Sequence, residues 1–221
     1  MIGVKGETMS LWKRLPIVAG AIGYTMFLRP QMLKWGTRLG ESQRLLPGDE
    51  LVPKPNFQMT HALNIDAPPE AVWPWIAQMG RERTGYYAFD LFTNRGIPSA
   101  TFIRQDIPAP EVGQEMDGGL RVLAVEPNRQ LIFGGFSLRR MGGVVQDMTT
   151  LYLLERRRDG STRVLVRRRA LSYGALGTLY NALYEPWYFA YSMQQLKRLK
   201  ALAESGAHLH DAAKVQAAQH A

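Results

Sequence analysis

The chain contains no cysteine and only four histidines in 221 residues. Without cysteine, disulfide bridges, thiolate nucleophiles, zinc-thiolate sites and iron-sulfur clusters are all excluded, although the compartment stays open. Three of the histidines, His208, His210 and His220, fall in an Ala- and Gln-rich tail that offers no rigid frame for a metal ion. We therefore predict no metal site and no cofactor.

The remaining histidine, His61, lies in a segment whose residues alternate as in a strand. The favoured interpretation is a strand residue that faces outward or has its hydrogen bonds satisfied, and the alternative is a general base. No Gly-x-Ser-x-Gly motif marks an activated serine. The sequence therefore offers no recognisable set of nucleophile, base and orienting group.

The chain also lacks an apolar run of the length that usually spans a membrane. Leu15 to Leu28 is uncharged and apolar, with Arg14 and Arg29 at its ends, but a bilayer-crossing helix needs about 20 residues. Two interpretations stay open: a membrane anchor that spans or lies on the bilayer, and a helix that packs on the domain or on a partner. Because the run ends in Arg29-Pro30 and not in a small-residue cleavage site, we do not expect a cleaved, secreted protein. The predicted location is membrane-associated or cytoplasmic.

Acidic residues are few, 19 against 27 lysines and arginines, which leaves a formal net charge of +8. Between Arg129 and Arg169, ten arginines accompany three acidic residues and no lysine. A segment this basic suits an anionic membrane surface, with a solvated outer sheet face as an equal alternative. Nucleic acid is disfavoured, because aromatic residues do not alternate with these arginines. The candidate contacts to an anionic surface are Arg156, Arg157, Arg158, Arg163, Arg167 and Arg169.

What is present is a series of strand patterns followed by one long helical pattern. Apolar residues alternate in five segments, and the proline-rich stretch from Ile97 to Val112 is expected to be a loop with weak strand character. Asp159-Gly160 between the last two segments is a strong hairpin signal. The five predicted strands are Met59 to Asp66, Leu120 to Glu126, Gln130 to Phe136, Met148 to Arg156 and Thr162 to Leu171.

The helical pattern runs from Ala175 to Ala203, with apolar and aromatic residues at three- and four-residue steps. Pro186 lies inside it, so the helix is expected to bend there and continue. Two short helices are predicted after the first strand, one following Asp66 and one from Tyr86 to Phe92. The predicted fold class is α+β: a curved antiparallel sheet of six to seven strands around a long C-terminal helix, preceded by an N-terminal apolar helix.

Composition divides the chain into three parts. Residues 1–46 comprise the apolar segment and a polar connector, residues 47–204 the domain, and residues 205–221 a flexible tail. Three blocks carry a family resemblance: LPGDELVPKP, IDAPPEAVWPWIAQMG and RERTGYYAFDLFTNRG. With the order of elements, they resemble the SRPBCC superfamily, the START-like helix-grip group, and within it uncharacterised polyketide cyclase/dehydrase-like bacterial members. One departure is Tyr86, where related sequences often have tryptophan.

The resemblance implies an apolar cavity between the sheet and the C-terminal helix, without supplying a catalytic signature. Aromatic residues are the expected lining: Trp73, Tyr86, Tyr87, Phe89, Phe133, Tyr152, Tyr184, Trp187, Tyr188 and Tyr191. Arg81 and Asp90 are candidates for polar contacts at the cavity mouth, although a structural ion pair is the favoured alternative. Glu185, next to Pro186, is a weak catalytic candidate, and a solvent-facing helix glutamate is the favoured interpretation.

These patterns favour a binding protein over an enzyme. The expected function is binding or transport of a hydrophobic small molecule, lipid-like or polyketide-like, near a membrane. One alternative is a cyclase/dehydratase-type enzyme that uses the same cavity, and another is a membrane-tethered accessory protein. The oligomeric state is not readable from the sequence.

Overall fold

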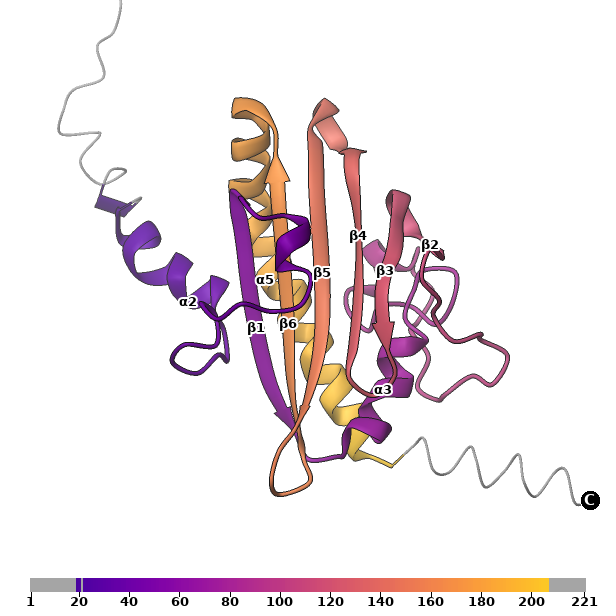
Figure 1. Ribbon diagram of the computed structural model, residues 1–221. Coiled ribbons are helices and arrows are strands. Elements are labelled where there is room, and N and C mark those ends of the chain that lie inside the picture. Colours follow the sequence, from indigo (N-terminus) through magenta and orange to yellow (C-terminus); the bar gives the residue numbers. More distant parts are fainter. Residues whose placement is uncertain (1–18, 21, 207–221) are drawn as a thin grey trace, which may run out of the picture.

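The structure is a computed structural model, and it describes residues 19, 20 and 22–206 (Figure 1). Residues 207–221 of the predicted tail lie outside the described residues, and so do residues 15–18 and 21 of the apolar run. The expectations for those parts stay predictions.

Six antiparallel strands form a single sheet with the order β1-β6-β5-β4-β3-β2, and their succession across the sheet is visible in Figure 1. The sheet prediction is therefore confirmed. The proline-rich stretch from Ile97 to Val112 is a loop, as expected, without a strand, and a two-residue edge strand follows it. The strands are β1 (Phe57–Ile65), β2 (Glu115–Met116), β3 (Leu120–Glu126), β4 (Gln130–Arg139), β5 (Val145–Arg156) and β6 (Thr162–Ser172).

Turn residues with positive φ join the strands. Gly160, at the β5–β6 turn, has a φ of 83°, a conformation that glycine adopts without steric cost. Asn128, at the β3–β4 turn, has a φ of 62°, which asparagine tolerates better than most residues. A register shift in β4 between Gly135 and Leu138 marks a bulge, and bulges increase the local twist of a sheet.

The long helix α5 (Gly174–Glu204) covers one face of the sheet and passes through Pro186 without interruption. Two short helices follow β1: α3 (Pro69–Ala77), whose Trp75 and Ile76 are buried, and α4 (Asp90–Thr93). Leu196 and Leu199 of α5 belong to the same buried cluster. The main core therefore lies between the sheet and the C-terminal half of α5. Short 3₁₀ turns occupy Asp49–Leu51 (η2), Asp117–Gly119 (η3) and Met141–Gly143 (η4).

The connector of residues 36–55 packs on the opposite face of the sheet and does not run free as a linker (Figure 1). Leu46 is buried there against Leu165 of β6. The connector also carries Glu41 and Asp49, whose carboxylates lie over the outward-facing side chains of β6. This face of the sheet is therefore covered by the chain itself.

That cover corrects the expectation for three of the arginines. The guanidinium of Arg163 lies 2.5 Å from Glu41, and Asp49 lies 2.6 Å from Arg167 and 3.3 Å from Arg169. All three arginine side chains are at most 11% exposed. They are structural ion pairs and have no free face for a membrane, because the connector supplies their counter-charges.

The residues that directly follow the apolar run pack on the domain, whereas the described apolar side chains of the run are largely exposed. Its residues form a π-helical segment η1 (Tyr24–Leu28) that continues into α2 (Arg29–Leu33). Arg29 pairs with Glu185 of α5, and the carbonyl of Met32 accepts a hydrogen bond from His61 of β1. Among the described residues, no helix combines the length and the apolarity needed to cross a bilayer.

Candidate ligand-binding cavity

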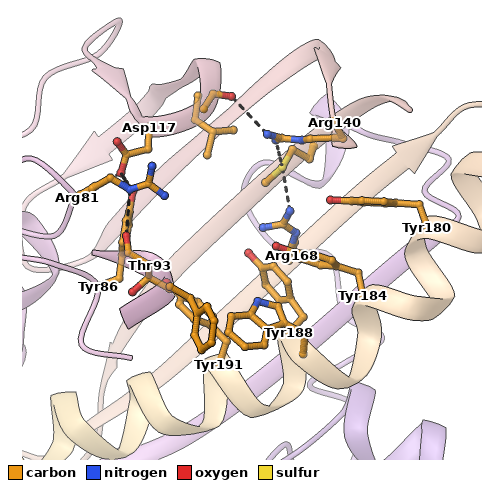
Figure 2. A pocket seen from close by; sticks show the side chains of 15 residues that line it. Arg81, Tyr86, Thr93, Asp117, Arg140, Arg168, Tyr180, Tyr184, Tyr188 and Tyr191 are labelled. Atoms are coloured by element: carbon orange, nitrogen blue, oxygen red, sulfur yellow. Dashed lines mark hydrogen bonds and ion pairs between the residues drawn. The ribbon is translucent and has the colours of Figure 1, made fainter. Parts of the chain in front are cut away.

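A cavity of about 540 Å³ lies between the first half of α5 and the sheet (Figure 2). Its helix wall consists of aromatic residues at positions 180, 184, 187, 188 and 191, a spacing that places them on one helix face. Tyr180 stacks on Tyr184 at 5.2 Å between ring centroids, and Tyr184, Tyr188 and Tyr191 continue the series at 5.7 Å. These rings form a largely apolar wall with hydroxyl groups along it.

The sheet wall comes from β3, β5 and β6, from the turn before β3 and from the residue after β4. Leu120 and Met148 supply apolar surface, and Arg168 projects into the cavity from β6. Arg140, just after β4, reaches the cavity from its upper rim in Figure 2. The cavity therefore joins an aromatic helix face to a sheet face that carries two cations.

A smaller inner chamber of about 110 Å³ continues toward the core and shares Tyr86, Tyr191 and Arg168 with the outer cavity. Phe133 and Tyr152 form its floor, stacked at 6.0 Å. The two chambers together offer a path from the surface to the buried centre of the sheet.

The side chain of Gln195 positions two tyrosines of the inner chamber through hydrogen bonds. The hydroxyl of Tyr152 donates to Oε1 of Gln195 at 2.5 Å, and Nε2 of Gln195 donates to the hydroxyl of Tyr191 at 3.0 Å. Burial raises the pKa of Tyr152 and of Tyr191, so both stay protonated at neutral pH. Apart from Arg168, the polar groups of the inner chamber are therefore uncharged.

At the mouth, Asp117 holds Tyr86. The Tyr86 hydroxyl donates to Oδ2 of Asp117 at 2.8 Å, and the backbone N–H of Arg81 donates to the same oxygen at 3.0 Å. Burial, followed by the charge of Asp117, raises the pKa of Tyr86. Nε of Arg81 lies 3.9 Å from Oδ2, so Asp117 is already engaged by its neighbours.

Arg168 is the most unusual residue of the site. It is 9% exposed, and its guanidinium carbon lies 3.9 Å from the centre of the Tyr188 ring, a cation–π contact. Its Nη2 donates to the sulfur of Met148 at 3.0 Å. Burial lowers the pKa of Arg168 to about 10, which leaves the group charged at neutral pH.

Seven of the ten aromatic residues expected at the cavity line it or its inner chamber: Tyr86, Phe133, Tyr152, Tyr184, Trp187, Tyr188 and Tyr191. Arg81 also lines it, as expected. The other three lie elsewhere. Trp73 packs on the core from α3, Tyr87 is fully buried with its hydroxyl near Gln78 and Thr84, and Phe89 stacks behind Trp187 at 5.0 Å.

The two carboxylates proposed from sequence also lie outside the cavity. Oδ2 of Asp90 accepts a hydrogen bond from the backbone N–H of Ser99, and it lies 3.4 Å from Arg198, which makes it structural. Glu185 is 3% exposed and faces the N-terminal helix, where Arg29 donates to both of its oxygens. Glu185 is therefore a buried ion-pair partner. Both expectations for it, a catalytic group in the cavity and a solvent-facing glutamate, are wrong.

His61 is a strand residue that is neither outward-facing nor fully satisfied, because Nδ1 has no hydrogen-bond partner among the described residues. It is fully buried between Trp35 and Phe189, and its Nε2 donates to the Met32 carbonyl at 2.6 Å. Burial lowers the pKa of His61 to about 4. It lies outside the cavity and faces the N-terminal segment.

Sequence reasoning missed several lining residues, chiefly Arg140, Arg168 and Met148. One signal was available for Arg168, because it shares the alternating face of β6 with Val164 and Val166, and both of these belong to the core. Arg140 had no such signal, since it follows the end of a strand.

No family model and no curated protein matches this chain. Solved structures resemble it at low identity. A protein of Mesorhizobium loti has a TM-score of 0.41 and 16% identity, over 67% of this chain and 98% of that protein. A protein of Nitrosomonas europaea has a TM-score of 0.44 and 13% identity, over 67% and 94%. A protein of the dynemicin biosynthetic locus has a TM-score of 0.42 and 15% identity, over 69% and 49%. By its own topology, a six-stranded antiparallel sheet with a long C-terminal helix, the chain fits a helix-grip fold.

Proposed function

We propose that this protein binds and carries a hydrophobic small molecule, lipid-like or polyketide-like, in the cavity between α5 and the sheet. The single observation that carries the proposal is the 540 Å³ cavity with its aromatic helix wall. Its volume lies within the roughly 300 to 1,000 Å³ of small-molecule sites, and such sites combine an apolar lining with a few polar groups. The sequence resemblance to the SRPBCC superfamily favours the same function.

The lining suggests the shape of the ligand. Tyrosine and tryptophan rings offer flat apolar surface, and their hydroxyl and indole groups can orient a polar substituent. The inner chamber continues beneath the outer cavity, so an elongated or polycyclic molecule fits better than a compact one. Membrane lipids and polyketides both meet this description.

Binding of the neutral fluorescent dye phenylnaphthylamine tests the proposal. The full-length protein should bind it saturably, and Trp187→Ala should weaken binding about tenfold while the protein stays folded, because the indole borders the cavity. Trp73→Ala is the matched control, since it removes the same side chain from α3 outside the cavity. Equal effects of the two substitutions, or no saturable binding by the wild type, would contradict the proposal.

The enzymatic alternative has less support. The Glu185 carboxylate lies outside the cavity, and Asp117, the carboxylate that does line it, is held by Tyr86 and the backbone of Arg81. A general acid or base needs a free path to the reacting proton. A cyclase or dehydratase activity is therefore the second choice for the same cavity.

We also propose that the protein binds to a membrane surface. Four apolar side chains of the N-terminal segment, Ile22, Met26, Phe27 and Leu28, are each more than half exposed. Leu176, Leu179 and Leu183 of α5 are exposed as well. The Arg29–Glu185 ion pair holds the N-terminal segment on α5. Exposed apolar side chains such as these suit insertion into the bilayer interface.

A further inference from the structure

Arg168 and Arg140 face the cavity without a carboxylate partner. The ion pairs among the described residues reach neither of them, and Asp117, the carboxylate that shares their cavity, pairs with Arg81. The neighbouring arginines on the outer face of β6 behave differently, because Arg167 pairs with Asp49. On β6, the arginines of the outer face are thus paired with carboxylates, whereas Arg168 on the cavity face is not.

The two guanidinium groups converge on one weak acceptor. Nη2 of Arg140 lies 2.9 Å from the sulfur of Met148, and Nη2 of Arg168 lies 3.0 Å from the same atom (Figure 2). A thioether sulfur is a poor hydrogen-bond acceptor. Two cations that share it repel each other, and the charge of Arg140 also acts to lower the pKa of Arg168. The position beside this sulfur is therefore strongly positive.

Polar groups near Arg168 are unsatisfied too. The hydroxyl oxygens of Thr150 and Ser192 line the inner chamber beside Arg168, and neither has a hydrogen-bond partner among the described residues. Buried polar groups and buried charges normally have partners, because leaving them without one is costly. An unpaired arginine that is nine-tenths buried and aimed into a cavity is therefore suited to bind an anion.

We infer that the ligand of this cavity is an amphipathic anion, whose oxyanion head group binds Arg168 and Arg140 and whose apolar body lies on the aromatic face of α5. The inference rests on the proposed function and names the ligand class. A guanidinium offers paired N–H donors that match the oxygens of a carboxylate, sulfonate or phosphate. Thr150 and Ser192 add hydroxyl donors on the inner side. Tyr188, beneath Arg168, joins the charged end to the apolar wall.

Two dyes of matched shape test the inference. Anilinonaphthalene sulfonate is phenylnaphthylamine with a sulfonate added, so the ratio of their dissociation constants isolates the head group. The full-length wild type should bind the sulfonate at least about tenfold more tightly than the neutral dye, the range of a charge-assisted hydrogen bond. Arg168→Met and Arg140→Met should each lower that preference by about tenfold. Arg139→Met is the matched control, because it removes an equal charge from an exposed neighbour of Arg140 that does not line the cavity.

The outcomes separate the two claims. If the wild type binds the neutral dye and the sulfonate equally, the head-group inference is overturned while the proposed function stands. A preference that Arg139→Met lowers as much as Arg168→Met reflects net charge alone, and this also overturns the inference. Binding of neither dye would remove both claims. If Arg168→Met fails to fold, Arg140→Met decides, together with decanoate, decyl phosphate and decanol as competitors that distinguish a carboxylate from a phosphate head group.

Discussion

Arg29 and Glu185 form a two-point ion pair across 156 positions of sequence. Nε of Arg29 donates to Oε2 at 2.7 Å, and Nη2 donates to Oε1 at 2.6 Å. The glutamate side chain is 4% exposed and the arginine 40%. This contact fixes the N-terminal helix on α5 close to Pro186. It also explains why a carboxylate is buried in the middle of an aromatic-rich helix.

The first prediction separates the two partners of this pair. Arg29→Met should cost about 1 to 3 kcal/mol of unfolding free energy, because it leaves a buried carboxylate without a partner, and the exposed side of the pair limits the loss. Glu185→Gln should cost less, since the neutral amide tolerates burial better. A double-mutant cycle by urea denaturation measures the coupling. A coupling energy near zero would show that the pair does not hold the segment.

The second prediction compares adjacent arginines of β6. Arg167→Met should destabilise the protein by about 3 kcal/mol, because Asp49 stays buried and loses a 2.6 Å partner. Arg168→Met should cost little or nothing in the absence of ligand, because it removes a buried charge that no carboxylate balances. Thermal unfolding of both variants measures the contrast. Equal losses of stability would argue that Arg168 is structural.

The third prediction concerns His61. Burial lowers its folded-state pKa to about 4, against about 6.5 in the unfolded chain, so the unfolded state binds the extra proton between these values. The stability is therefore fully present above pH 6.5 and is lost as the pH falls toward 4, by about 3 kcal/mol. His61→Gln keeps a donor for the Met32 carbonyl but does not titrate. Its unfolding free energy should be flatter over this range, and an unchanged slope would contradict the assignment.

The fourth prediction concerns the membrane. The full-length protein should sediment with vesicles of phosphatidylcholine and phosphatidylglycerol, and binding should persist at high salt, because salt screens charges but not apolar insertion. Phe27→Glu should abolish sedimentation, since this exposed side chain belongs to the apolar group. Leu39→Glu, at an exposed leucine of the connector, is the matched control. Protein that stays in the supernatant at low salt would remove the membrane from this account.

The sheet and the long helix were predictable because their signals are local. Alternation gave β6 and β3 to within one residue, and the helical spacing gave α5 as Ala175 to Ala203 against the observed Gly174–Glu204. These patterns record which side of an element is buried, and burial is what determines the fold. The short edge strand β2 carries too few residues to show any period.

The polar half of the site was not predictable, because its partners are distant in sequence. Arg167 finds Asp49 across 118 positions and Glu185 finds Arg29 across 156, and no local pattern encodes such pairs. Without knowledge of these partners, the sequence does not distinguish the paired arginines of the β5–β6 hairpin from the unpaired ones. The alternation of β6 did place Arg168 on the core side, but the general rule that arginine faces solvent argued against that placement. Trp73 illustrates a different error. It was expected in the cavity because it lies on the apolar face of α3, but an apolar pattern does not distinguish a core position from a cavity position.

The exposed arginines of the β5–β6 turn, Arg156 and Arg158, lie at the opposite end of the sheet from the first turn of α5, because β6 separates the two. A membrane contact by the apolar N-terminal group therefore does not bring this turn to the same surface. We accordingly place the anion-recognition role inside the cavity and not on the hairpin.

A crystal structure of the full-length protein with anilinonaphthalene sulfonate bound tests the central claim most directly. The account predicts that the naphthalene rings lie against Trp187 and Tyr188 and that the sulfonate oxygens lie within hydrogen-bonding distance of the Arg168 guanidinium. Dye found instead on the exposed leucines of α5, with side chains filling the space between α5 and the sheet, would contradict it.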